Sequence, residues 1–332
     1  MAYENKELFQ QIADKAIEKY DFSVKVRAGL MQFSENATYL LRNEDSGQEL
    51  AVLRISRPGY HRIEELEAEI VWLQVIRQTT DLQVTEPIAG KNGEYIQRIV
   101  AADFKEYFCI MTKYLTGTAP EEENERGAKK QFTQLGEITA QLHRQTQMWN
   151  GAKNLQRVHW SYDNMIGATP VWGPWQAAAD LTQDMIRTLT KTSQIIKKRL
   201  ERLGKTKDNY GLIHADLRLA NLLVEGEQMK IIDFDDCGFG WHLHDLASAV
   251  SFIETKPIIP ELVEAWLKGY SKILPLNHKE CQEIDTFIMQ RRMQLMAWMA
   301  SHSESTPVQK LNEGFTEGTV ELAEKYLGKF DI

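Results

Sequence analysis

The feature that constrains the fold most is a polar loop held between short apolar segments in the second half of the chain. Tyr210–Ile213 is apolar, and the polar loop begins at His214. Asn221–Val224 returns to apolar character, Glu225–Glu227 has the composition of a tight turn, and Met229–Ile232 has the pattern of a second buried strand. The pattern predicts a hairpin that carries polar residues at the ends of its strands, where side chains can be held rigidly.

Three polar residues in this region have the order and spacing of a phosphoryl-transfer site. They are Asp216, Asn221 five positions later and Asp233 twelve positions after that. Transfer of a γ-phosphoryl group depends on positioning and charge neutralisation, and Mg²⁺ needs few protein ligands because it keeps several waters. We therefore assign Asp216 to the attacking hydroxyl, and Asn221 and Asp233 to Mg²⁺ bound with the phosphates of ATP. An isolated Asp and Asn near a turn are usually caps, but this ordered set between two strands is uncommon by chance.

The run Ile213–Leu246 resembles the aminoglycoside phosphotransferase and choline kinase family, which has a protein-kinase-like fold. That family carries a His-x-Asp-x-x-x-x-Asn loop followed by an Asp-containing metal loop, and both are present here. It also tends to place an aromatic residue before an Asp-Leu pair, which Trp241 and Asp245 match. The resemblance implies that Asp245 braces the catalytic loop, and an ordinary helix-start residue is the equal alternative. Leu142-His143 matches a Leu-His pair of the same family.

The resemblance implies an α+β, bilobal fold with a small N-lobe at 1–111, a hinge at 112–117 and a large, mostly helical C-lobe at 118–332. The N-lobe should hold a five-stranded antiparallel sheet and one main helix. Hydrophobic periodicity predicts strands at 22–30, 37–42, 49–55, 95–100 and 107–113, and helices at 5–20 and 63–77. It predicts C-lobe helices at 132–146, 177–202, 260–270, 280–299 and 307–327.

Two details of the N-lobe depart from the protein-kinase pattern. No G-x-G-x-x-G follows the first strand, although Ser34 in the predicted turn 31–36 could help to cover phosphates; a plain hairpin turn is the equal alternative. Arg54 stands where the V-A-I-K pattern has lysine. An arginine can bring positive charge to the phosphates and can hold a carboxylate in two-pronged fashion, with Glu69 as the expected partner and Glu65 as the alternative. A surface role on an edge strand is the other interpretation of Arg54.

Only the family resemblance predicts where the adenine base of the nucleotide binds. In that family the segment joining the lobes hydrogen-bonds the adenine through its backbone. The matching residues here are Met111, Thr112, Lys113, Tyr114 and Leu115.

Two further features of the C-lobe bear on the site. Arg218 lies two residues after Asp216, where protein kinases usually carry a lysine that touches the transferring phosphate. An arginine at this position could stabilise the equatorial oxygens of the transferring phosphoryl group. An exposed arginine on the loop surface without a catalytic role is the equal alternative. The aromatic segment 158–175 could form a substrate wall, although packing beneath a long loop is the favoured interpretation. The histidines His242 and His244 lie two apart, which disfavours a metal pair on one helix face.

Bulk composition excludes several classes of protein. The 332 residues include 39 Lys and Arg against 47 Asp and Glu, a net charge of −8, which disfavours general nucleic-acid binding. The cysteines Cys109, Cys237 and Cys281 are widely spaced, so neither a disulfide framework nor a zinc site is expected. The first residues show no apolar signal segment, and no apolar run approaches the ~20 residues that span a bilayer. We expect a cytoplasmic protein whose partner is a small hydroxylated substrate.

Three functions agree with these features. The favoured one is an ATP- and Mg²⁺-dependent phosphotransferase that acts on a hydroxyl of a small metabolite, such as an amino alcohol, a homoserine-like compound, a sugar or an aminoglycoside. The alternatives are a bacterial protein Ser/Thr kinase and a nucleotide-binding pseudokinase. No A-P-E element follows Asp233, which disfavours the protein kinase, and the intact set of Asp216, Asn221 and Asp233 disfavours the pseudokinase.

Overall fold

The computed structural model describes residues 6–33, 36–120, 125–303 and 313–331, together with positions 308 and 311. The chain forms two compact units. Unit 1 comprises Met1–Thr118, Asn154–Arg157 and Leu223–Asp235, and unit 2 comprises the remaining residues. Unit 1 thus includes the segment of the predicted metal loop. The predicted boundaries at 1–111, 112–117 and 118–332 stay predictions.

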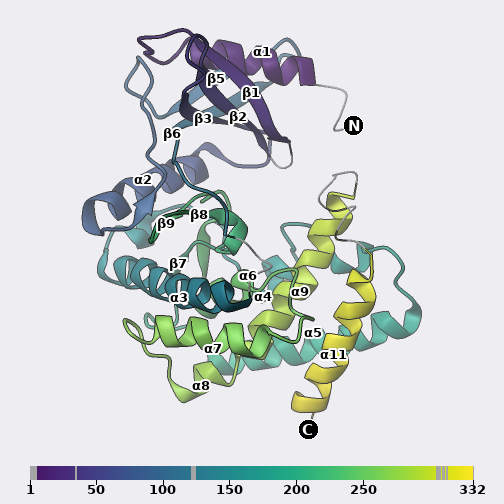
Figure 1. The fold of residues 1–332 in the computed structure, drawn as a ribbon. Helices are drawn as coiled ribbons and strands as arrows, with labels where there is room; N and C mark the ends of the chain where they lie inside the picture. The colour runs from purple at the N-terminus through teal and green to yellow at the C-terminus, as the bar shows by residue number, and fades with distance from the viewer. Residues whose placement is uncertain are drawn as a thin grey trace. The chain divides into compact units, whose positions relative to one another are not determined.

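Unit 1 is built on a five-stranded antiparallel sheet, as predicted. Its strand order is β1-β2-β3-β6-β5, and helix α1 (Lys6–Ile17) packs on this sheet (Figure 1). The strands are β1 (Val26–Phe33), β2 (Asn36–Asn43), β3 (Glu49–Ser56), β5 (Ile96–Val100) and β6 (Glu106–Lys113). The two helices serve the two faces of the sheet, since α1 contributes to one apolar core and α2 (Ile63–Thr79) contributes to a second.

The turn predicted at 31–36 is shorter than expected. Residues 31–33 belong to β1, where Gln32 pairs with Thr38 and Phe33 pairs with Ala37 after a register shift near Leu30. The strand continues because Phe33 buries its ring edge-on against Phe9, with centroids 4.9 Å apart. Ser34 lies outside the described residues.

The hairpin of β8 (Leu222–Glu225) and β9 (Gln228–Ile231) forms a small sheet with β4 (Gln83–Val84). Gly226 makes its tight turn with a φ of 63°. The predicted strand–turn–strand pattern is therefore present. The ring of Phe234, just past β9, packs against Trp72 of α2 with a centroid distance of 5.3 Å, which anchors the segment that carries Asp233.

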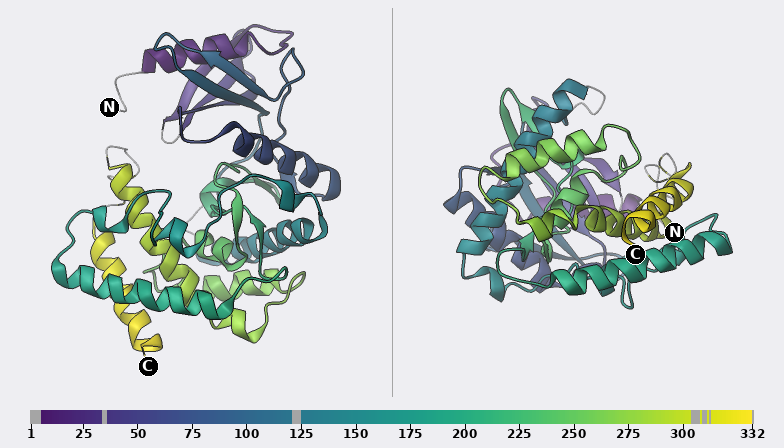
Figure 2. Two further views of the ribbon diagram at one scale, coloured as in Figure 1. Left: turned by 180° about the vertical axis from the view of Figure 1, so that it is seen from behind. Right: turned by 90° about the horizontal axis from the view of Figure 1, so that it is seen from below.

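Unit 2 is mostly helical, as predicted, with one two-stranded ribbon (Figure 2). Its longer helices are α3 (Glu125–Met148), α5 (Gln183–Leu203), α7 (Ile259–Tyr270), α9 (Ile284–Ser301) and α11 (Phe315–Phe330). Shorter helices are α4 (Tyr162–Met165), α6 (Leu243–Ala249) and α8 (His278–Cys281), and the ribbon pairs β7 (Tyr210–Ile213) with β10 (Gly238–Trp241). None of the helices in the described ranges is long and apolar enough to cross a membrane.

Some predicted helix boundaries differ from the structure; the helix expected at 132–146, for example, spans Glu125–Met148. The helix expected from 177 begins at Gln183, because Thr182 caps it by accepting a hydrogen bond from the Met185 N–H. The helix expected at 280–299 is divided into α8 and α9, since Asn277 and Glu280 form a capping box that starts the short α8. The helix expected at 307–327 includes α11, which begins after Gly314 at a φ of 71°, and the expected start at 307 lies outside the described residues.

Candidate functional site

The catalytic loop of unit 2 is braced by one buried carboxylate. Asp245, in the first turn of α6, accepts hydrogen bonds from the backbone N–H groups of Ala215 at 2.7 Å and His214 at 3.2 Å. His143 of α3 donates to the same carboxylate from Nε2 at 2.9 Å. Ala215 has a φ of 67°, which is unfavourable for a residue with a side chain, and its carbonyl accepts from Ser248 at 2.7 Å. Asp245 thus holds the loop in a strained conformation, as the resemblance implied.

The environment of Asp245 keeps it charged. Burial tends to raise the pKa of Asp245, but the hydrogen bond and charge of His143 outweigh burial, so the pKa lies below its ordinary value of 3.8. His143 is itself fixed, since its Nδ1 hydrogen-bonds the Tyr270 hydroxyl at 2.8 Å and its ring stacks on His242. Leu142-His143 is therefore a core element of the site's support. His242 and His244 are both buried core residues.

Asp216 lies at the centre of a cluster of hydrogen-bond donors. Asn221 donates from Nδ2 to Asp216 Oδ2 at 2.7 Å and to the Asp216 carbonyl at 2.8 Å. Arg218 approaches Oδ2 with Nε at 3.3 Å, and Arg291 donates from Nη2 to Oδ1 at 2.7 Å. The side-chain nitrogen of Asn221 is engaged in hydrogen bonds to Asp216. Its Oδ1 is therefore the atom that could bind a metal ion. The structure therefore brings Asp216, Arg218 and Asn221 together within one loop.

Arg291 is a site residue that sequence reasoning missed. It lies in α9, 75 positions after Asp216, and is buried. The signal in the sequence was the pair Arg291-Arg292 within a helix that is otherwise rich in methionine and other apolar residues. Buried arginines are uncommon unless a carboxylate pairs with them.

In unit 1, Arg54 forms the two-pronged ion pair expected of a kinase-like N-lobe. Its two terminal nitrogens contact the Glu69 carboxylate at 2.9 and 2.6 Å, so Glu69 and not Glu65 is the partner. A third carboxylate, Asp235, lies 3.4 Å from Nη1. Burial would lower the pKa of Arg54, but Glu69 and Asp235 raise it above its usual value. The contact of Arg54 with a nucleotide stays a prediction.

Asp235 is the second residue that sequence reasoning missed. Its carboxylate accepts from Asn36 at 2.8 Å and contacts His61 Nε2 at 3.0 Å, while Arg157 donates to its backbone carbonyl. Burial would raise the pKa of Asp235, but Arg54, His61 and Arg157 hold it well below its usual range. The available signal was that the run from Ile231 to Cys237 holds three aspartates, of which only Asp233 was assigned a role.

Asp233 differs from Asp235 in its exposure. It is exposed, with a φ of 63°, between the end of β9 and the anchored Phe234. Across the described ranges, no three His, Cys, Asp or Glu side chains are placed to hold a metal ion. A magnesium ion in phosphoryl transfer needs only one or two side-chain oxygens beside phosphate and water, so the hard oxygen donors of Asn221 and Asp233 fit it chemically.

The residues predicted to contact adenine lie at the end of β6 and just after it. Met111 is buried and its carbonyl accepts from Ile88 N–H at 2.8 Å, while Lys113 N–H donates to the Glu86 carbonyl at 2.8 Å. Thr112 pairs with Val52 of β3. Tyr114 donates its N–H to the carbonyl of Leu50 at 3.2 Å, and Leu115 follows it. The structure shows their places, and their contact with adenine stays a prediction.

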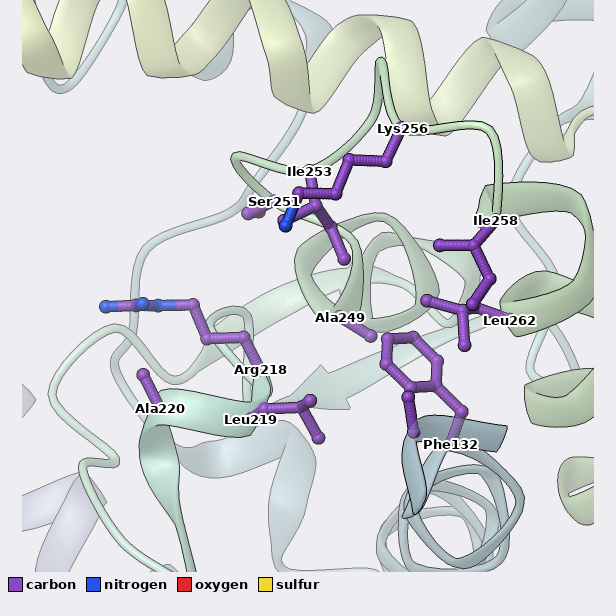
Figure 3. Close-up of a pocket in the computed structure, with 11 residues that line it drawn as sticks. Phe132, Arg218, Leu219, Ala220, Ala249, Ser251, Ile253, Lys256, Ile258 and Leu262 are labelled. Atoms are coloured by element: carbon purple, nitrogen blue, oxygen red, sulfur yellow. The ribbon is translucent and has the colours of Figure 1, made fainter. Parts of the chain in front are cut away.

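A cavity of about 290 Å³ in unit 2 adjoins the catalytic loop (Figure 3). Phe132 and Leu262 form part of its apolar wall, and Arg218 lies on the side of the catalytic loop. In Figure 3 the Lys256 side chain folds back toward Ser251. The aromatic segment lies elsewhere in this unit: Trp172 packs on Trp160 and on the Arg291 guanidinium, at 5.4 and 5.1 Å.

Comparisons with known proteins place the chain in a family and a fold. The family model described as the phosphotransferase enzyme family matches residues 32–283. The amicoumacin kinase of Bacillus subtilis (strain 168) is 21% identical over 294 residues, which cover 86% of this chain and 82% of that protein. A solved structure of a microcompartment-associated aminopropanol kinase is 35% identical, covers 96% of this chain and 98% of its own, and has a TM-score of 0.87.

The amicoumacin kinase hAmiN, solved in complex with AMP-PNP, Ca²⁺ and Ami, is 20% identical with a TM-score of 0.75, over 94% of this chain and 93% of its own. These structures have the protein-kinase-like fold, and the predicted fold class is therefore confirmed.

Proposed function

Because the chain belongs to the phosphotransferase enzyme family, whose members phosphorylate hydroxyl groups of small molecules, we propose that it transfers the γ-phosphoryl group of ATP, with Mg²⁺, to the hydroxyl of a small amino alcohol. The observation that carries the proposal is the position of Asp216, which is oriented by Asn221 inside a loop braced by Asp245. The acceptor class is suggested by the 35% identity to an aminopropanol kinase over nearly the whole chain.

Each residue has a role in this proposal that its side-chain chemistry supports. Asp216 would orient the acceptor hydroxyl and take its proton. Arg218, beside Asp216 at 3.3 Å, would bring positive charge to the transferring phosphoryl group. Asn221 and Asp233 would hold Mg²⁺, which when bound neutralises charge on the phosphate oxygens.

The N-terminal unit would hold the rest of the nucleotide. Arg54, kept charged and oriented by Glu69, would meet the α- and β-phosphates. The backbone of Met111, Thr112, Lys113, Tyr114 and Leu115 would face the adenine.

The test is an ATP-consumption assay on matched acceptors. The panel comprises 1-amino-2-propanol, ethanolamine, homoserine, a hexose, an aminoglycoside and a generic protein. We expect turnover on the amino alcohols and a loss of about 10²–10⁴-fold in kcat for Asp216→Asn, with ATP affinity by calorimetry nearly unchanged. Asp184→Asn, a substitution at an exposed residue of α5, is the control.

Other outcomes would identify the alternatives. Turnover on protein alone would indicate a protein kinase. ATP binding without turnover on any acceptor would indicate a pseudokinase. An equal loss of ATP binding and turnover in Asp216→Asn would contradict the role of Asp216.

A further inference from the structure

Resting on the proposed function, we propose that Arg291 is a positioning residue of the phosphoryl transfer. It fixes the Asp216 carboxylate and defines the oxygen, Oδ1, to which the acceptor hydroxyl binds. The carboxylate and the guanidinium come from distant segments of unit 2, since Asp216 lies in the catalytic loop and Arg291 in α9.

The Arg291 guanidinium is held on several sides. Nε donates to Ser251 Oγ at 3.3 Å, Nη1 donates to Gln294 Oε1 at 3.1 Å, and Nη2 donates to Asp216 Oδ1 at 2.7 Å. The ring of Trp172 lies 5.1 Å from the central carbon. The residue is 2% exposed. A guanidinium restrained in this way has a defined orientation, and it imposes that orientation on the carboxylate it contacts.

The two oxygens of Asp216 are unequally used. Oδ2 accepts from Asn221 at 2.7 Å and from Arg218 at 3.3 Å, whereas within the described part of the chain Oδ1 accepts from Arg291 alone. An ionised carboxylate has about four lone-pair sites, two on each oxygen. The remaining acceptor position is therefore on Oδ1, and a hydroxyl bound there lies next to Nη2 of Arg291.

A cation beside a general base is compatible with this reaction. The transition state of phosphoryl transfer is loose, so bond formation to the nucleophile and loss of its proton are little advanced. Orientation of the hydroxyl then matters more than the strength of the base. A fixed guanidinium next to the nucleophile also stabilises negative charge on the transferring group.

Arg292 offers a matched comparison because it is the next residue and is equally buried, at 3% exposed. Its Nη1 contacts Glu254 at 2.7 Å, its Nε contacts Thr319 at 2.8 Å, and its Nη2 donates to the Phe315 carbonyl at 3.0 Å. The contacts with Thr319 and Phe315 connect α9 to α11, the contact with Glu254 reaches the segment after α6, and none of them involves Asp216. Loss of Arg292 leaves the buried Glu254 without its ion-pair partner, and loss of Arg291 removes one of the partners of the partly buried Asp216, so both substitutions should destabilise the fold.

The experiment compares Arg291→Met, Arg291→Lys and Arg292→Met for thermal stability, kcat and KM for the acceptor and for ATP. Activity is measured well below the lowest melting temperature. We expect Arg291→Met to lower kcat about 100-fold, with KM for ATP changed less than about threefold. Arg291→Lys should recover part of kcat, and added guanidinium ion should recover part of it in Arg291→Ala. Arg292→Met should lose stability but keep kcat within about threefold.

Crystal structures of Arg291→Met and Arg292→Met give a readout independent of any acceptor. Asp216 should change its rotamer in Arg291→Met and keep it in Arg292→Met. An unchanged Asp216 in Arg291→Met, or an equal fall in kcat in both variants, would overturn the proposal. Failure of every acceptor with wild-type enzyme would instead refute the proposed function, and the two structures would still decide the role of Arg291.

Discussion

Replacement of Asp245 by Asn tests whether the catalytic loop depends on one buried charge. Asp245 accepts from the Ala215 N–H at 2.7 Å, the His214 N–H at 3.2 Å and His143 Nε2 at 2.9 Å. Asn has nearly the same shape but presents one oxygen and one NH₂ group. At least one of the three donors would therefore face another donor in a site that is fully buried.

The expected loss follows from these contacts. A hydrogen bond to a charged group contributes about 1.5–3 kcal/mol, and a buried donor left without a partner costs about 1–3 kcal/mol. We expect the free energy of unfolding to fall by about 3 kcal/mol, which for a unit of this size lowers Tm by about 6–12 °C. The strained Ala215 would relax, and a shift of about 1 Å in the loop would lower kcat about 100-fold. Because the folded pKa of Asp245 lies below the unfolded value, its contribution is complete at neutral pH and is lost only in acid.

The assay combines thermal unfolding followed by circular dichroism with steady-state kinetics. Asp285→Asn is the control, since Asp285 makes an exposed ion pair with Lys329 at 2.6 Å and its loss should cost less than about 0.5–1 kcal/mol. A variant Asp245→Asn with wild-type Tm and kcat would refute the bracing argument. A lower Tm with wild-type kcat would show that Asp245 stabilises the unit without positioning the loop.

Three further perturbations have defined outcomes. Burial, with a neighbouring guanidinium, lowers the pKa of His244 to about 3, so the unfolded chain binds a proton below pH ~6.5 that the folded chain does not. Urea titrations should therefore show about 2 kcal/mol less stability at pH 4.5 than at pH 6.5 from this residue, and a smaller loss in His244→Phe. Gly269→Ala should lower Tm strongly, because its Cβ would lie 1.9 Å from a backbone carbonyl oxygen of α3. Gly328→Ala should raise the free energy of unfolding by up to about 1 kcal/mol, because its Cβ would meet nothing within 4 Å and alanine favours a helix more than glycine does. Arg54→Lys should weaken ATP binding about tenfold by calorimetry, because lysine cannot keep the two-pronged contact with Glu69; unchanged affinity would contradict this role.

The parts of the site that could be predicted are encoded locally. The loop from His214 to Asn221 lies between a strand and a hairpin whose apolar and turn residues follow one another directly in the sequence. The order of strand β3 and helix α2 was sufficient to select Glu69 as one of two candidate partners for Arg54. Here the positions of chemistry-bearing side chains follow from neighbouring elements, so periodicity and motif spacing contain the necessary information.

The parts that could not be predicted depend on contacts between distant segments. Arg291 reaches Asp216 across 75 positions, and Asn36 reaches Asp235 across 199 positions. Such pairs are set by how helices and strands pack, and a single sequence does not specify which buried arginine meets which carboxylate. The late start of α5 has a different cause, because the local cap at Thr182 was overlooked in favour of apolar periodicity.

The aspartates of the site differ in burial, and this difference separates support from chemistry. Asp245 and Asp235 are buried, and their carboxylates lie among hydrogen-bond donors, out of reach of a substrate. Asp216 keeps an acceptor position on Oδ1, and Asp233 is exposed at the end of its strand. A group that binds substrate or metal must be within reach of it, so it cannot be fully buried. The motif spacing selected Asp216 and Asp233, and in the folded chain these two residues are less buried than Asp245 and Asp235.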